Sequence, residues 1–328
     1  MVRTLILGAG PAGERHGRAF RALADRCALL GVYDPDPAAA QALAQVLSVP
    51  VVEQLDRALE NADAAIVASA LEQRPVLTRR ALERGLDVLV EPPLAPTADL
   101  SHGLLSAIVR SPRRPVAMVA FDEHFDPTVR ELRALVADQM LLSVHAERSD
   151  PAPVGPTPER DVVHDLMQQD LQFVLSLTGE TIAATQAAGR RVRRSGPIDH
   201  ATALLVLEDD LVASLTASRA GAARVRRLTV MTSQARVSAD LDRRAIEAVR
   251  TSAAANGRHE AVAQRIDVVA GDATLAQAEA FLRYVDRRTS PDVGIGTAIA
   301  CQEAAMAILK RIELVAHRPA ARRGPQAA

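Results

Sequence analysis

The 328-residue sequence predicts an α/β protein with two domains: first a doubly wound parallel sheet, then an α+β domain with a broad, mostly antiparallel open sheet. Up to residue 121, short apolar segments alternate with helical segments, which is typical of right-handed βαβ units. Beyond it, consecutive strand patterns follow one another with turn residues between them. We therefore expect domains at 1–121 and 122–316, followed by a flexible tail at 317–328.

A glycine-rich turn lies between the first predicted strand, at residues 5–7, and a helical run at 14–24. Its three glycines have the spacing G-x-G-x-x-G. In a Rossmann fold the first glycine allows a tight turn, the second lets a diphosphate approach the backbone, and the third lets the helix pack on the strand. The helix amino terminus then favours an anion. The residues expected to hold the diphosphate are Gly8, Gly10, Pro11, Ala12 and Gly13.

A second apolar strand, at residues 29–33, ends at Asp34. A carboxylate at this place can accept hydrogen bonds from the adenosine ribose diol of a dinucleotide. It would repel a 2'-phosphate, and the following Pro35 and Asp36 supply no arginine to hold one. The sequence therefore predicts NAD(H) as the cofactor rather than NADP(H). The alternative is a structural turn that binds no nucleotide.

The other elements follow from apolar periodicity. In the first domain we expect further strands at 51–52, 64–68, 87–90 and 116–121, and helices at 37–47, 55–60, 74–84 and 97–109. In the second we expect strands at 140–148, 182–192, 201–207, 211–217, 226–232, 235–239 and 245–250, and helices at 128–136, 163–178, 273–287 and 297–314. These last four helices are expected to cover one face of the second sheet. The other face is left for a second copy of the chain, which predicts a homodimer or a higher homo-oligomer.

Composition limits the class of protein. The chain is 48% hydrophobic and 24% charged, with a formal net charge of -1, so it offers no field of one sign to nucleic acid or to an acidic membrane. We expect no membrane span and no signal peptide, because no apolar run is long enough and the first strand begins near the amino terminus. Cys27 and Cys301 are expected to be reduced, buried thiols of a cytoplasmic protein.

Five segments in order resemble the Gfo/Idh/MocA family of glucose-fructose oxidoreductases and inositol dehydrogenases over residues 3–314. The glycine turn extends to His16 as in that family, and V-L-V-E-P-P-L-A at 88–95 is similar to its V-L-x-E-K-P-L-A segment. The run at 121–127, D-L-M-Q-Q-D at 165–170 and the closing helices also fit. The resemblance implies a nicotinamide-dependent oxidoreductase acting on a small molecule. It also implies that the cofactor site includes Ser69, Ala70, Arg74, Glu91 and Pro92.

This chain differs from the family pattern at three places that carry the family's chemistry. The resemblance implies a catalytic lysine where this chain has Pro92, and a histidine where it has Gln169. It implies T-P-n-x-x-H where residues 69–74 read S-A-L-E-Q-R. The only lysine of the chain, Lys310, lies in the final predicted helix. The usual lysine and histidine relay is therefore excluded by the sequence.

Hydride transfer from a carbinol needs a group that exchanges a proton with the reacting oxygen. Asp165 and Gln169 share one helix face, so Asp165 is a candidate base if desolvation makes it more basic, and Gln169 a hydrogen-bond donor. Asp165 is equally well explained as a charge at a helix amino terminus. His124 is a further candidate proton donor, although a solvated loop histidine is the simpler interpretation. His164 is expected to point about 100° away and to serve packing. No metal spacing is found.

Two functions remain open. The first is an NAD(H)-dependent oxidoreductase with an atypical proton relay, acting on a small polar or sugar-like compound or an imine. The second is a non-redox relative, a scaffold, sensor or partner subunit, that keeps the fold and possibly NAD(H) without dehydrogenase activity. The intact glycine turn and Asp34 favour the first, and the joint replacement of lysine and histidine favours the second.

Overall fold

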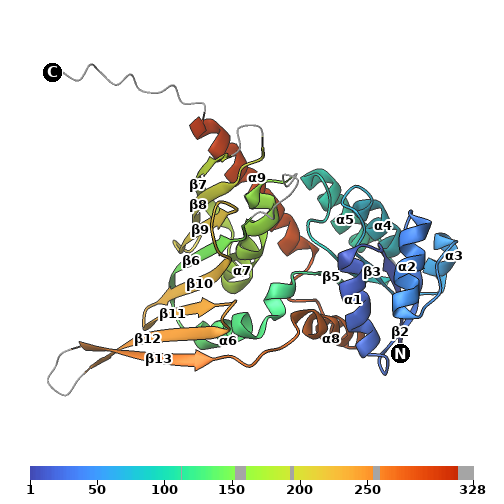
Figure 1. Ribbon diagram of the computed structural model, residues 1–328, viewed down its shortest axis with the longest axis horizontal. Coiled ribbons are helices and arrows are strands. Elements are labelled where there is room, and N and C mark those ends of the chain that lie inside the picture. The colour runs from blue at the N-terminus through green and yellow to red at the C-terminus, as the bar shows by residue number, and fades with distance from the viewer. Residues whose placement is uncertain (112, 152–159, 193–195, 254–258, 317–328) are drawn as a thin grey trace.

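The computed structural model describes residues 1–111, 113–151, 160–192, 196–253 and 259–316, and the predicted tail lies outside them. The chain forms two lobes around two sheets (Figure 1). The first sheet is parallel with five strands in the order β2-β1-β3-β4-β5. The second has eight strands in the order β13-β12-β11-β10-β6-β9-β8-β7. The predicted fold class, a doubly wound parallel sheet followed by an α+β domain, is confirmed.

Most strand residues of the first lobe are buried, as expected where helices cover both faces of a parallel sheet. Its strands are β1 (Val2–Leu7), β2 (Cys27–Tyr33), β3 (Ala64–Val67), β4 (Asp87–Val90) and β5 (Ala117–Val119). Its helices are α1 (Pro11–Ala22), α2 (Pro37–Leu47), α3 (Leu55–Glu60), α4 (Arg74–Glu83) and α5 (Ala98–Arg110). The strand predicted at 51–52 is reduced to one bridge between Val51 and Val32.

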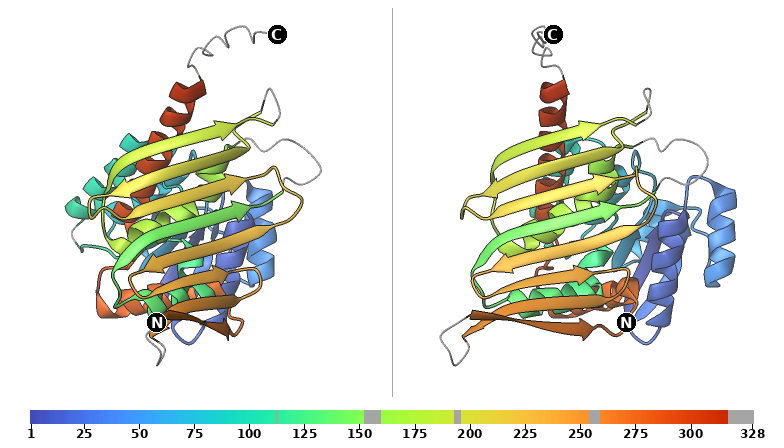
Figure 2. Two further views of the ribbon diagram at one scale, coloured as in Figure 1. Left: turned by 90° about the vertical axis from the view of Figure 1, so that its left-hand side faces the viewer. Right: turned by 60° about the vertical axis from the view of Figure 1, so that its left-hand side comes forward.

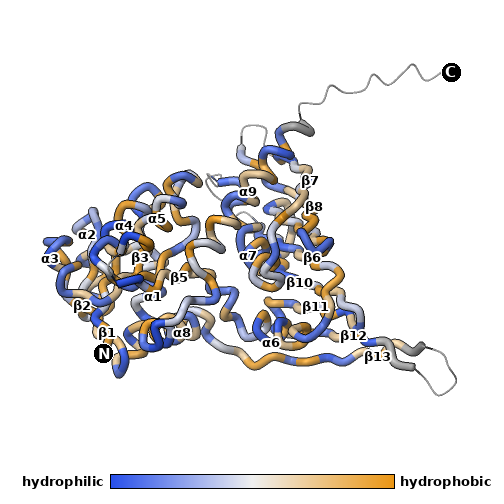
Figure 3. The backbone as a smooth tube through the Cα atoms, turned by 180° about the vertical axis from the view of Figure 1, so that it is seen from behind, coloured by the Kyte–Doolittle hydropathy of each residue, from blue (hydrophilic) through white to orange (hydrophobic). Residues whose placement is uncertain are grey.

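Alternate residues of these strands belong to two hydrophobic cores. Leu5 and Leu7 of β1 pack with side chains of α3, α4 and α5, whereas Ile6 packs with those of α1 and α2. Figure 3 shows hydrophobic segments gathered around β1, β3 and β5 and hydrophilic ones on the outer helix α3. Local signals start the helices, because Asp36 accepts a hydrogen bond from the backbone N–H of Ala38 at 2.9 Å and a proline opens α2.

The second sheet is antiparallel except for the parallel pair β6 and β9. Helices α6 (Pro127–Val136), α7 (Gln168–Thr178) and α9 (Ile295–Ala316) lie against one face, and Figure 2 shows the other face without a covering helix. The strands are β6 (Leu141–Ser149), β7 (Ile182–Arg190), β8 (His200–Leu207), β9 (Val212–Ser218), β10 (Val225–Thr232), β11 (Ala235–Asp240), β12 (Ala245–Ala253) and β13 (His259–Asp267). Strand β13 was not predicted; polar residues interrupt its sequence, and it is an edge strand paired with β12.

Helix α8 (Ala273–Arg287) differs from its predicted placement. It packs on α1 of the first lobe instead of on the second sheet. The rings of Phe281 and Phe20 meet edge to face with centroids 6.0 Å apart, and both side chains are fully buried. Together with Leu282 and Val285 they join the same core as α2. A late segment of the chain therefore completes the first lobe and links the two lobes.

Candidate active site

The glycine turn has the geometry that a dinucleotide needs. Gly8 has a φ of +122°, and a Cβ there would clash with the backbone of Ala68. A Cβ at Gly13 would clash with the carbonyl oxygen of Gly8, so these two glycines allow helix, turn and strand to pack closely. Among the described residues, a Cβ at Gly10 would meet nothing within 4 Å, and no side chain caps the first turn of α1. The open space therefore lies where a diphosphate would approach the helix amino terminus.

Asp34 stands at the end of β2 and braces the same turn. Its Oδ2 accepts a hydrogen bond from the backbone N–H of Ala9 at 2.7 Å, and its Oδ1 accepts one from Asp36 at 3.0 Å. Each carboxylate oxygen can accept a second hydrogen bond. The residues present fit a dinucleotide whose ribose diol reaches Asp34 while its diphosphate lies over Gly10.

Arg74 ties together two loops at the same edge of the sheet. Its guanidinium donates to the carbonyl oxygen of Ser69, after β3, and to that of Pro93, after β4, at 2.7 Å each. Burial lowers the pKa of Arg74, and its Nε has no hydrogen-bond partner in the described part of the chain. Arg74 thus supports the loop of Ser69 and Ala70 through carbonyl contacts.

Glu91 follows β4 directly and accepts from two residues of α1. Nε2 of His16 lies 2.6 Å from Oε1 of Glu91, and a terminal nitrogen of Arg15 lies 3.0 Å from the same oxygen. Burial alone would raise the pKa of Glu91, but the His16 hydrogen bond and the Arg15 charge outweigh it and lower that pKa. His16 is fully buried, and sequence reasoning gave it no role beyond the family motif.

A small cavity of about 130 Å³ opens at the carboxyl ends of β4 and β5, where α/β proteins bind ligands. It brings together four residues singled out from the sequence: Glu91, Pro92, Asp165 and Gln169. The full lining is Arg15, Glu91, Pro92, Pro93, Ala120, Phe121, Asp122, Arg160, His164, Asp165, Gln168 and Gln169. We call this cavity the polar pocket.

His164 lines the polar pocket, contrary to the packing role expected for it. The predicted single helix at 163–178 begins as a π-helical turn, η2 (Val163–Met167), before α7. In such a turn the angular positions differ from those of an ideal α-helix. Asp161 accepts from the backbone N–H groups of Val163 and His164 at 2.9 Å, and its Oδ2 lies 2.8 Å from Nδ1 of His164. The signal in the sequence that could have indicated the pair of Asp161 and His164 is their spacing of three residues.

Asp165 and Gln169 stand in different environments. The Asp165 carboxylate forms an ion pair with Arg219, the residue directly after β9, and the Asp165 side chain is 45% exposed. Because nearly half of this side chain is exposed, burial does not provide the desolvation that Asp165 needs to act as the expected base. Gln169 is the reverse case, because its Oε1 is buried and has no hydrogen-bond partner among the described residues. That oxygen is ready to accept a hydrogen bond from a ligand.

His124 is not brought together with Asp165 and Gln169. It lies in the 3₁₀ turn η1 (Asp122–Phe125), buried against the ring of Phe125, and Nε2 of Gln172 donates to its Nδ1 at 3.2 Å. Burial, reinforced by the Arg133 charge, lowers the pKa of His124 to about 4. Its imidazole is therefore neutral at physiological pH and is absent from the lining of the polar pocket.

Asp122, which sequence reasoning passed over, does line the polar pocket. Its Oδ1 accepts from the backbone N–H of Glu123 at 3.0 Å, and no ion pair holds it within the described chain. Burial raises the pKa of Asp122; Arg15 opposes this shift, and the charges of Glu123 and Glu91 add to it. The only signal in the sequence was its place directly after the strand predicted at 116–121.

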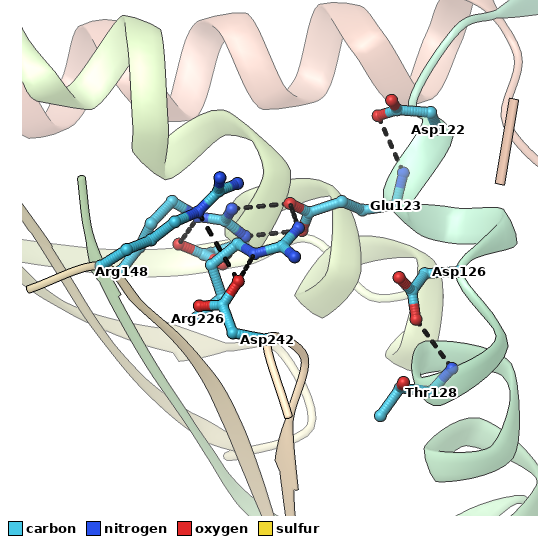
Figure 4. A network of polar contacts seen from close by, with 9 residues as sticks. Asp122, Glu123, Asp126, Thr128, Arg148, Arg226 and Asp242 are labelled. Atoms are coloured by element: carbon cyan, nitrogen blue, oxygen red, sulfur yellow. Dashed lines mark hydrogen bonds and ion pairs between the residues drawn. The ribbon is translucent and has the colours of Figure 1, made fainter. Parts of the chain in front are cut away.

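Next to Asp122, Glu123 belongs to a buried charge network (Figure 4). Both terminal nitrogens of Arg148, from β6, donate to Glu123 at 2.7 Å, and Arg148 also donates to Asp170 of α7 at 2.8 and 3.1 Å. Arg226 of β10 reaches Glu123 at 3.3 Å and Asp242 at 2.9 Å. Burial would lower the pKa of Arg148, but the facing carboxylates raise it well above its usual value. The network fixes η1 to the second sheet.

In the part of the chain that the structure describes, no group of three or more His, Cys, Asp or Glu side chains is arranged to hold a metal ion. Within the same residues, every helix is too short or too polar to cross a membrane.

Comparisons with known proteins agree with this arrangement. A family model described as the oxidoreductase family with an NAD-binding Rossmann fold, GFO_IDH_MocA, matches residues 2–118. A UDP-N-acetylglucosamine 3-dehydrogenase of Acidithiobacillus ferrooxidans is 26% identical over 288 residues, covering 87% of this chain and 88% of the relative. A myo-inositol dehydrogenase of Streptomyces leeuwenhoekii is 30% identical over 227 residues, covering 65% of this chain and 69% of the relative.

Solved structures have the same fold over nearly the whole chain. One of UDP-N-acetylglucosamine 3-dehydrogenase from Acidithiobacillus ferrooxidans gives a TM-score of 0.87 at 23% identity, covering 97% of this chain and 99% of that one. Levoglucosan dehydrogenase in complex with NADH and levoglucosan gives 0.82 at 15% identity, covering 95% and 97%. From the sequence match, the two-sheet fold and the glycine turn together, the chain belongs to the Gfo/Idh/MocA family of oxidoreductases.

Proposed function

We propose that this protein is an NAD(H)-dependent oxidoreductase with a proton path that does not use the lysine and histidine implied by the family pattern. The observation that carries the proposal is the open space at Gly10, beside Asp34 and on the same sheet edge as the polar pocket. When bound, NAD(H) would supply or accept the hydride. The residues that would hold it are those of the glycine turn, Asp34 and the loop of Ser69 and Ala70.

The order of the strands supports the direction in which the dinucleotide lies. Asp34 follows β2, the glycine turn follows β1, and Glu91 and Asp122 follow β4 and β5. Because the sheet order is β2-β1-β3-β4-β5, a dinucleotide laid along this edge has its adenosine near Asp34 and its nicotinamide toward the polar pocket. Asp34 also supports NAD(H) over NADP(H), since its charge repels a 2'-phosphate.

The substrate we propose is a small polar or sugar-like compound. The polar pocket carries Arg15 and Arg160 together with three carboxylates, and the unpartnered Oε1 of Gln169 can accept from a hydroxyl group. Asp165, held by Arg219, would hold a second hydroxyl. The chain has only seven aromatic residues and no tryptophan, which leaves few surfaces for stacking a sugar ring. Hydrogen bonds therefore carry the proposed recognition.

Two measurements test this function. Titration of NADH, followed by its fluorescence, should show saturable binding that NADPH does not reproduce. A panel containing UDP-N-acetylglucosamine, myo-inositol and levoglucosan, on which the relatives are named, should then show a change in the nicotinamide absorbance band for at least one compound. Absence of NADH binding would remove the nicotinamide-dependent role altogether.

A second function is favoured by Pro92 and Gln169, which remove both members of the family's relay. It is a non-redox scaffold, sensor or partner subunit that keeps NAD(H) as a bound ligand. Saturable NADH binding without turnover across the panel is its expected result. Turnover of any panel compound at the nicotinamide absorbance band would eliminate it.

For the assembly we propose a homodimer formed through the open face of the second sheet. That face is uncovered in Figure 2, and on β8 it presents the apolar side chain of Leu204, which is 42% exposed between the buried Ala203 and Leu205. Light scattering at micromolar concentration should give twice the chain mass. We also propose a cytoplasmic location, because Cys27 and Cys301 are both free and buried, as expected in a reducing compartment.

A further inference from the structure

We propose that His164, oriented by Asp161, is the residue that exchanges the proton with the substrate oxygen in the polar pocket. This inference rests on the proposed oxidoreductase function and names a residue for it. It places the proton path on the first turn of the helical segment that also carries Gln169, five residues before the position where the family pattern has its histidine.

The geometry of the pair carries the inference. Asp161 is itself fixed, because Oδ1 accepts from the backbone N–H groups of Val163 and His164 at 2.9 Å. Its other oxygen lies 2.8 Å from Nδ1 of His164 and can only accept from it. A neutral imidazole then carries its proton on Nδ1 and leaves a lone pair on Nε2. Within the described chain Nε2 has no hydrogen-bond partner, and the side chain is 24% exposed.

The other acids of the polar pocket are less suited to the task. Glu91 is engaged by His16 and Arg15, and Asp165 is engaged by Arg219. Asp122 carries no ion pair but also has no second residue that orients it, since it accepts only from the adjacent backbone N–H. His164 alone combines a free nitrogen with an orienting carboxylate, the arrangement by which a positioned base is recognised.

The surroundings of His164 carry both signs of charge. From its own segment it faces Asp161, Asp165 and Arg160, and across the polar pocket it faces Arg15, Glu91 and Asp122. Asp161 would stabilise the imidazolium that forms when Nε2 takes a proton, just as an orienting carboxylate does in other histidine bases.

The step balances as follows. In the oxidising direction the hydroxyl proton of the substrate passes to Nε2 of His164. The carbinol C–H bond breaks, and its hydrogen would leave with the electron pair to NAD⁺, the two-electron oxidant that the proposed function supplies. The remaining oxygen electron pair forms the carbonyl, so the substrate loses two electrons and two hydrogens. His164 afterwards releases its proton to solvent; in the reducing direction the same proton is returned to the carbonyl oxygen.

The test uses His164→Gln, which keeps a polar side chain without a titratable group, and Asp161→Asn. In His164→Gln, NADH affinity should stay within about threefold of the wild type while kcat falls by about 10²–10⁴. The matched control is His102→Gln, since His102 on α5 pairs with Glu303 at 2.8 Å on the surface and does not line the polar pocket. It should change neither quantity.

A readout without substrate comes from the ¹⁵N shifts of the histidine rings in the free protein, with His164 assigned by its loss in His164→Gln. The neutral ring should carry its proton on Nδ1, and Asp161→Asn should shift the population toward the other tautomer. A ring protonated on Nε2 in the wild type would overturn the proposal.

Other outcomes also decide. Turnover by His164→Gln within about threefold of the wild type would overturn the inference, all the more if Asp122→Asn loses the activity instead. Wild-type protein that binds NADH but converts no compound of the panel would overturn it together with the oxidoreductase function. Wild-type protein that does not bind NADH would refute that function and, with it, the proton step assigned to His164, while the ¹⁵N shifts still report separately whether the His164 and Asp161 pair exists.

Discussion

Replacing Arg148 by methionine is expected to destabilise the protein strongly, because it leaves a buried carboxylate without compensation. The Arg148 and Asp170 side chains are only 8% and 2% exposed. In Arg148→Met, Glu123 keeps Arg226 at 3.3 Å, but Asp170 keeps no cation among the described residues. Methionine retains much of the length of the arginine stem, so the change removes charge and hydrogen bonds more than volume.

The magnitude follows from the loss of one partner of a buried ion pair, which costs about 3–5 kcal/mol. An unfolding entropy of about 2.1 cal/mol/K per residue gives about 0.7 kcal/mol/K for 328 residues, so the melting temperature should fall by about 4–7 °C. The surface control is Arg227→Met on β10, whose half-exposed pair with Glu147 at 3.5 Å contributes about 0–1 kcal/mol.

Thermal unfolding by calorimetry at neutral pH measures both variants. The double variant Arg148→Met with Asp170→Asn should recover part of the loss, since no unpaired charge is left. A melting temperature for Arg148→Met no lower than that of Arg227→Met would refute the reasoning, because the network would then contribute no more than a surface pair.

The acid side of the same experiment has a defined sign. The charges of Arg148 and Arg226 overcome the effect of burial and lower the pKa of Glu123. A carboxyl group with a lowered folded-state pKa adds stability above its unfolded pKa, and that stability is lost as the pH falls through the folded value. Burial raises the pKa of Asp170. Acidification should therefore reduce the difference in melting temperature between Arg148→Met and the wild type. In the variant Asp170 becomes protonated, and in the wild type Glu123 loses its contribution to stability.

Three further changes have definite expected outcomes. The Gly10→Val variant should fold normally but show no NADH binding in a fluorescence titration, whereas Gly13→Ala should lower the melting temperature. Unchanged NADH affinity in Gly10→Val would contradict the assignment of the glycine turn as the diphosphate site. Burial raises the pKa of Asp122 in the folded protein, so the charged carboxylate opposes folding at pH values above that pKa. Asp122→Asn should therefore have a higher melting temperature than the wild type at neutral pH. The two melting temperatures should be equal at pH values below the pKa that Asp122 has in the unfolded chain. Phe281→Ala should cost about 3–5 kcal/mol in urea unfolding, and a loss below about 1 kcal/mol would argue against the docking of α8 on α1.

The first lobe could be predicted closely because its signals are local. Helix α2 (Pro37–Leu47) has the predicted bounds, and local features fix both ends: the Asp36 cap with its proline at the start, and Ser48 in the left-handed conformation after the last residue. The helix at 273–287 also has the predicted bounds, but its partner was wrong, because an apolar stripe does not specify which surface it covers. Strand β13 depends on pairing with β12, a non-local contact that periodicity does not reveal.

The polar pocket shows the same limit at the scale of single residues. Family motifs and strand ends indicated Glu91, Pro92 and Gln169, which the structure brings together. The expectation for His164 assumed an ideal α-helix of about 100° per residue, whereas the π-helical turn changes the direction of its side chain. The orientation of His124 depends on the 3₁₀ turn η1, whose geometry no residue type announces.

That 3₁₀ turn connects the charge network to the polar pocket. Three consecutive side chains diverge from it: Asp122 into the pocket, Glu123 into the arginine network, and His124 against Gln172 of α7. Arg148 and Arg226 belong to the second sheet, so this sheet fixes the position of η1 and with it one wall of the pocket. His164 lies on the other wall of the pocket, in the turn η2 that leads into α7. Helix α7 carries Asp170, the second carboxylate held by Arg148. One buried guanidinium therefore sets the spacing between both walls, which is why the loss of Arg148 should disturb the pocket while leaving the glycine turn intact.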